Sequence, residues 1–203
     1  MKKTYLIFIV LLALMWFNHA IAQQLPVYSQ FMYNKQLINP AAFDEKEDLL
    51  IKVHHRSQWV GFEGAPVNQT LSGQKRITQK HYGVGGHVFN DMYGPIRNTG
   101  LNLSYNYHMR LADSLFFSLG LAGAVYQYYM DRDKMRMIDE TDMLIPDAVN
   151  GSSIIPDASF GTYLYHPKYY FGASLLHIAR NKVRPFKSES YYANLPLVHH
   201  YYL

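Results

Sequence analysis

The stretch "LNLSYNYHMR", residues 101–110, decides the fold. Leucine, tyrosine and methionine occupy its odd-numbered positions, and asparagine, serine, histidine and arginine occupy its even-numbered positions. A period of two gives an extended strand one apolar and one polar face. Ten residues also suffice to cross a bilayer at a tilt, which takes about 9 to 11. The stretch therefore predicts a β-strand that fits either a half-buried sheet or a transmembrane wall.

Seven further segments have strand character, because they are rich in aromatic and β-branched residues and are bounded by turn-forming residues. No segment carries a sustained apolar repeat at helical spacing, and the chain holds 18 Tyr, 11 Phe and 13 Gly. The sequence therefore predicts an all-β protein. The further strands are expected at about 49–58, 67–76, 82–89, 115–129, 158–165, 169–178 and from near 198.

The connections between these strands are predicted to alternate in length. Outer-membrane barrels show this pattern, with short periplasmic turns and longer outside loops, whereas crossovers break it in soluble sandwiches. The pattern favours an antiparallel outer-membrane β-barrel with about eight visible strands over a soluble β-sandwich. Long connections are expected at 59–66, 90–98, 130–157 and 179–197, and short ones at 77–81, 112–114 and 166–168.

The N-terminus, "MKKTYLIFIVLLALMWFNHAIA" at residues 1–22, has the three parts of a secretory signal peptide: a basic start, an apolar run and small residues before Gln23. The apolar run covers residues 5–17, which is shorter than the roughly 18 residues that a membrane-spanning helix needs. We expect a cleaved signal peptide at 1–22, an N-terminal periplasmic-side segment at 23–48, a barrel domain at 49–203 and an outer-membrane location.

The charge and the reactive residues point to no catalytic or metal site. The net charge of +4 is spread along the chain, which gives no basic stripe for nucleic acid, and the absence of Cys excludes disulfides. The adjacent pairs His54-His55 and His199-His200 point to opposite strand faces. Ser104 and His108 share a face but lie about 13 Å apart at strand rise, too far for a hydrogen bond. We predict no catalytic residue, metal or cofactor.

The stretch "RSQWVGFEGAPVNQT", residues 56–70, is predicted to form a hairpin tip. Gly61 and Gly64 permit backbone angles closed to other residues, and Pro66 fixes the start of the returning strand. Period two puts Arg56 and Gln58 on one face, with Arg56 directed to the lumen or a partner, and Trp59 on the other face, either at a membrane interface or as a plug under the loop. The candidate structural or partner-contact residues here are Arg56, Gln58, Trp59, Gly61, Gly64 and Pro66.

Four stretches together resemble the PorP/SprF family of the type IX secretion system. They are "LPVYSQFMYNKQLINPAAF" (25–43), "RSQWVGFEGAPVNQTLSG" (56–73), "GVGGHVFNDMYGPIRNTGLNLSYNYHMRL" (83–111) and "PDASFGTYLYHPKYYFGASLLH" (156–177). The resemblance implies a non-enzymatic outer-membrane barrel that supports the export or surface anchoring of large adhesins, including those of gliding motility. The implied partners are the secretion machinery, a secreted adhesin and outer-membrane lipid.

The resemblance also bears on both ends of the chain. It implies that the segment containing Asn39 and Pro40 lies at the periplasmic end, and Pro26 and Pro40 predict that this segment is no regular strand. Family members are longer, so we expect the strands of this sequence to form part of a larger barrel. The alternatives are a passive pore, favoured by the polar face of residues 102–110, and an outer-membrane lipid hydrolase.

Overall fold

The computed structural model describes residues 31–44, 48–77, 81–131, 134, 151–183, 195–197 and 199–202. Two short 3-10 helices, η1 (Phe31–Tyr33) and η2 (Lys35–Leu37), precede the strands. The strands are β1 (Leu49–Ser57), β2 (Val67–Ile77), β3 (Tyr82–Tyr93), β4 (Ile96–Ala112), β5 (Leu115–Met130), β6 (Gly151–His166), β7 (Tyr169–Leu176), β8 (Lys182–Val183), β9 (Leu195–Pro196) and β10 (His200–Tyr202). The predicted signal peptide lies outside the described residues.

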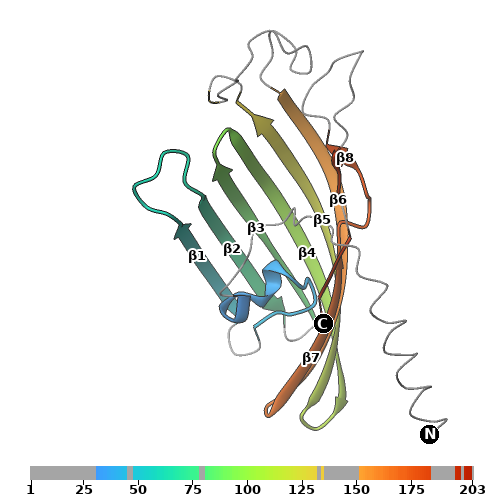
Figure 1. The fold of residues 1–203 in the computed structure, drawn as a ribbon. Helices are drawn as coiled ribbons and strands as arrows, with labels where there is room; N and C mark the ends of the chain where they lie inside the picture. The colour runs from blue at the N-terminus through green and yellow to red at the C-terminus, as the bar shows by residue number, and fades with distance from the viewer. Residues whose placement is uncertain are drawn as a thin grey trace, which may run out of the picture.

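The main sheet is a curved antiparallel meander (Figure 1), in which the described strands follow the order β1-β2-β3-β4-β5-β6-β7-β10. Strands β8 and β9 form a separate pair. Within the described residues β1 and β10 each have one strand neighbour, so this sheet is open. No helix in the described part of the chain has the length and apolarity to span a membrane. The all-β, antiparallel prediction is confirmed.

The two faces of the sheet reverse the arrangement of a soluble protein. One face, here called the outer face, exposes apolar side chains; the opposite inner face buries polar ones. On β4, Leu101 and Leu103 are exposed while Asn102 and Ser104 are buried, as the period of two predicts. Water-soluble sheets bury their apolar face, whereas a barrel wall in lipid turns it outward. Apolar outer-face residues include Leu49, Ile51, Val53, Leu71, Val84, Val88, Leu119, Leu121, Val125, Ile154 and Phe160.

The predicted alternation of loop lengths is wrong at the β3–β4 connection. Residues 90–98 were expected to form a long loop, but β3 continues to Tyr93 and pairs there with Ile96, which leaves a two-residue turn. Gly94 has a φ of +56°, and a two-residue hairpin turn of type II′ requires glycine at this first central position. The strands therefore extend through a polar stretch that resembles a loop in sequence.

The predicted long connection at 130–157 is also shorter than expected. Strand β6 begins at Gly151 and pairs along its length with β5, so residues 151–157 belong to the sheet. Apolar residues of this stretch predict, from sequence, either a partner-binding or lid surface or a cover folded over the barrel mouth, and they lie outside the described residues. They are Met135, Met137, Met143, Leu144 and Ile145.

Candidate functional site: the loop pocket and the N-terminal segment

The β1–β2 loop forms one side of a pocket of about 360 Å³. Three of the predicted site residues, Arg56, Gln58 and Pro66, are half-buried here, and Trp59 lies beside them. Arg56 is on the inner face, as period two predicted. The pocket, hereafter the loop pocket, is lined by Arg56, Gln58, Trp59, Pro66, Asn68, Asp91 and Tyr93.

Backbone hydrogen bonds fold the loop and join it to the next hairpin. The amide of Gln58 donates to Pro66 O at 3.0 Å, which closes the β1–β2 hairpin. The amide of Gly94 donates to Gly64 O at 2.8 Å, so the β1–β2 loop rests on the β3–β4 turn. Gly61 and Gly64 both have positive φ, +103° and +73°, which glycine adopts without a Cβ penalty. Neither glycine lines the pocket; both shape the loop that does.

The polar groups of the loop pocket place donors beside an acid. With its amide oxygen toward Arg56, Gln58 accepts a hydrogen bond from Arg56 Nε at 2.9 Å. The Asp91 carboxylate lies near both Arg56 and Asn68. Asn68 is buried, and its side-chain amide interacts with the Asp91 carboxylate, although not at the length and angle of an ordinary hydrogen bond.

Trp59 has an unusual backbone for so large a residue. Its φ is +51°, and left-handed backbone at a non-glycine residue costs on the order of 1–3 kcal/mol and clusters at functional sites. Its side chain is 72% exposed. The prediction that Trp59 lies on the face opposite Arg56 and Gln58 is wrong, because all three line the loop pocket. The strand period no longer holds after Ser57, where β1 ends, and the left-handed conformation could not be read from the sequence.

The other two predicted site residues, Asn39 and Pro40, lie away from the loop pocket, in the N-terminal segment of residues 31–44. This segment lies against the inner face, as the blue ribbon of Figure 1 shows. Asn39 Nδ2 donates to Thr162 O on β6 at 3.0 Å and to Ala173 O on β7 at 3.4 Å. Its Oδ1 accepts from the amide of Ala41 at 2.9 Å. Asn39 thus ties the segment to two strands, and the segment forms no β-strand, as predicted.

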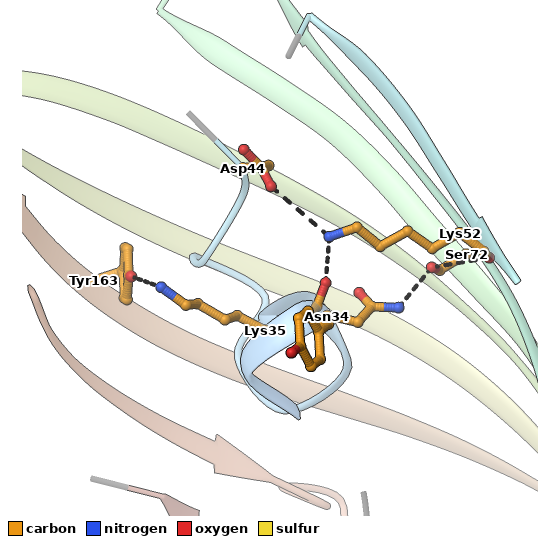
Figure 2. A network of polar contacts seen from close by, with 7 residues as sticks. Asn34, Lys35, Asp44, Lys52, Ser72 and Tyr163 are labelled. Atoms are coloured by element: carbon orange, nitrogen blue, oxygen red, sulfur yellow. Dashed lines mark hydrogen bonds and ion pairs between the residues drawn. The ribbon is translucent and has the colours of Figure 1, made fainter. Parts of the chain in front are cut away.

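Polar side chains hold the segment along its length (Figure 2). Asn34 Nδ2 donates to Ser72 Oγ on β2 at 2.7 Å, and Gln36 Nε2 donates to Ser104 Oγ on β4 at 3.0 Å. Lys52 Nζ on β1 donates to the backbone of the segment at Tyr33 O and lies 3.8 Å from the Asp44 carboxylate. The contacts reach from β1 to β7, so the segment bridges most of the described sheet.

Lys35 contacts two tyrosines of the sheet at once. Its Nζ donates to the Tyr163 hydroxyl at 2.9 Å and lies 3.7 Å from the ring centroid of Tyr170. Replacing Lys35 by Met keeps its length but removes the charge, so we expect the segment to be held less tightly by about 1–2 kcal/mol. Chymotryptic release of the segment from the purified protein in detergent measures this. Lys75→Met, on the exposed outer face of β2, is the control; equal release from both variants would contradict the prediction.

Glycines of the inner face make room for the segment. A Cβ on Gly120 of β5 would lie 2.5 Å from Pro40 O, and one on Gly83 of β3 would lie 2.8 Å from the Phe43 ring. A Cβ on Gly161 of β6 would lie 3.0 Å from Pro40 Cδ. The sheet therefore lacks side chains where the segment passes, and backbone packs directly on backbone.

A buried contact between Asp157 and His177 was missed by sequence reasoning. Asp157 Oδ2 and His177 Nδ1 are in contact, and their side chains are 0% and 3% exposed. Asp157 Oδ1 accepts from the amide of Ala179 at 3.3 Å, while His177 adopts a φ of +59°. The pair fixes the turn that leaves β7. Local pattern places Asp157 in a loop, so it carries no signal that the two residues meet.

The weaker chemical hypotheses find no supporting geometry. Among the described residues no group of three His, Asp or Glu side chains could hold a metal ion. Ser104, considered as a hydrolase nucleophile, instead accepts the hydrogen bond from Gln36. The imidazole of His108, its proposed partner, lies buried on the same face, and its ring nitrogens form no hydrogen bond in the described part of the chain.

Comparison with known proteins identifies the family. A family described as "Type IX secretion system membrane protein PorP/SprF" matches residues 20–203. No curated protein and no solved structure matches the chain. The match covers the four resembling stretches, the N-terminal segment and every described strand. An inside-out antiparallel sheet agrees with a membrane protein of this kind, and the chain therefore belongs to the PorP/SprF family of type IX secretion system membrane proteins.

Proposed function

We propose that this protein is a non-enzymatic outer-membrane component of type IX secretion that supports the export or surface anchoring of large adhesins and gliding motility proteins. The family match over residues 20–203 carries this proposal. In it, residues 1–22 are a cleaved signal peptide, and the N-terminal segment lies at the periplasmic end of the barrel. The segment packs nearer the end of the sheet that carries the short β4–β5 and β6–β7 turns. Short turns face the periplasm in outer-membrane barrels, which supports this orientation although the two-residue β3–β4 turn lies at the opposite end.

The inside-out sheet supports the membrane location. An apolar outer face spread over β1 to β6 would aggregate in water, whereas lipid covers it without penalty. The inner face is occupied by the N-terminal segment through contacts to β1, β2, β4, β6 and β7. These contacts favour an anchoring or docking component over a passive pore, since a pore needs an open polar lumen.

Deletion of the gene tests the proposal. We expect surface adhesin, detected by antibody on intact cells, to be lost, because the secretion apparatus lacks one of its outer-membrane components. Adhesin retained inside the cells would indicate a role in export, and adhesin released into the medium would indicate a role in anchoring. Restoring the gene should restore display. Normal adhesin display in the deletion strain would refute the proposal.

A further inference from the structure

We propose that the loop pocket is a binding site for a neutral sugar ring. The proposal goes beyond a role in secretion and does not depend on it, because it rests on the chemistry of the pocket alone. Its volume of about 360 Å³ falls at the lower end of the range of about 300–1,000 Å³ for small-molecule pockets. A small ligand of one or two rings matches this size.

The pocket contains both a basic and an acidic side chain, which favours a ligand without net charge. Arg56 and Asn68 bring N–H donors to the pocket, and the Asp91 carboxylate lies beside them. An anionic ligand would face the Asp91 carboxylate, and a cationic ligand would face Arg56. A hydroxyl group both donates and accepts hydrogen bonds, so neighbouring hydroxyls of a sugar can satisfy an acid and an amide that lie side by side.

The buried amide of the pocket is directed at the acid. Asn68 is 8% exposed, and its side-chain amide interacts with the Asp91 carboxylate, although not at the length and angle of an ordinary hydrogen bond. A carboxylate offers about four acceptor positions. A sugar hydroxyl seated in the loop pocket would donate to Asp91 beside Asn68.

The aromatic side chains supply the second half of sugar recognition. Trp59 and Tyr93 both line the pocket, and Trp59 is held exposed by a left-handed backbone. The negative face of an aromatic ring attracts polarised C–H groups, which one face of a pyranose ring presents together. The amide of Phe62 donates to Trp59 O at 3.1 Å, so the loop holds the Trp59 backbone at the rim of the pocket.

Trp59 also provides the measurement. The sequence holds two tryptophans, Trp16 and Trp59. Trp16 lies in the proposed signal peptide, whose removal leaves a mature protein that reports on the pocket through Trp59 emission alone. The mature protein in detergent is titrated with methyl glycosides of glucose, galactose, mannose, rhamnose and N-acetylglucosamine. We expect a saturable change in emission with at least one of them, little affected by salt because the ligand is neutral.

Matched variants locate the binding. Asn68→Leu keeps the side-chain size and removes the donor, and Asp91→Asn removes the acid; each should weaken binding at least tenfold. Phe62→Ala is the control, because Phe62 is 76% exposed in the same loop but does not line the pocket. If Asn68→Leu fails to fold, Asp91→Asn alone decides. Unchanged affinity in Asp91→Asn overturns the proposal.

Two sources of sugar are then separated. Two ligands are titrated in parallel: oligosaccharide released from the lipopolysaccharide of the same cells, and glycopeptides from the surface proteins of those cells. The ligand that binds more tightly identifies the source of the sugar. No saturable change with any sugar overturns the proposal, as does a change produced by unglycosylated peptides alone. Neither result would bear on adhesin display in the deletion strain.

Discussion

Gly120→Val is expected to expel the N-terminal segment from the inner face of the sheet. A Cβ at this position would lie 2.5 Å from Pro40 O, and the obstacle is backbone, which cannot rotate aside. Forcing side-chain volume into a packed site typically costs about 1–3 kcal/mol and sometimes more. A cost of about 3 kcal/mol corresponds to a roughly hundredfold shift toward the undocked segment.

Tryptic cleavage after Lys35 measures this shift, because docking ties Lys35 to Tyr163 and Tyr170. Gly123→Val is the matched control: it lies on the same strand, faces outward, and a Cβ there would meet no atom within 4 Å. Rapid cleavage of the Gly120 variant and slow cleavage of the control are expected. If the two proteins are cut at the same rate, the segment does not pack on β5 as described.

Asp157→Ala is expected to destabilise the fold by about 1–3 kcal/mol, the usual cost of leaving a buried polar group without its hydrogen-bond partner. The substitution leaves His177 buried at 3% side-chain exposure and removes the acceptor for the amide of Ala179. The loss should appear as a lower urea midpoint of the protein purified in detergent. Asp157→Asn keeps one acceptor oxygen, so its urea midpoint should lie between those of the unsubstituted protein and Asp157→Ala.

An exposed ion pair provides the comparison for Asp157. Arg110 and Asp113 lie 3.2 Å apart at the β4–β5 turn, with side chains 60% and 105% exposed. Exposed pairs contribute little because water and salt screen them, so Asp113→Ala should leave the urea midpoint unchanged. If Asp157→Ala also left the urea midpoint unchanged, the contact with His177 would not stabilise the turn after β7.

The strands that could be predicted are those whose pattern is complete within a few residues. Residues 101–110 alternate without interruption, and their two faces appear in the structure as expected. The same rule placed Arg56 on the inner face. The end of β3 was missed because Asn90 and Asp91 break the alternation, although both continue to pair with β4. Where side chains on both faces are polar, periodicity carries no strand signal.

The start of β6 was missed for a different reason. Pro156 lacks a backbone donor and argues against a central strand. At Pro156, however, β6 pairs with β5 on one side only, since β7 joins β6 from Phe160 onward. The position therefore behaves as a sheet edge, which tolerates proline. Only the register of the assembled sheet reveals this.

Contacts between distant parts of the chain could not be predicted. Asn39 and Pro40 were singled out by family resemblance, yet nothing in their neighbourhood indicates that they meet Gly120 and Gly161. Asn68, Asp91 and Trp59 gather at one pocket through the register of three strands and two turns. Local pattern can place a side chain on a face, but the partner across that face depends on the whole sheet.

The path of the N-terminal segment constrains the order in which the protein assembles. Lys35 and Ile38 find their partners at Tyr163 and Ser174, 128 and 136 positions later in the chain. Long-range contacts form slowly because a large loop must close first. The surface on which the segment rests does not exist until β6 and β7 have joined the sheet. The segment is thus synthesised early but is among the last parts of the chain to reach its final place. Its docking follows the assembly of β6 and β7 into the sheet.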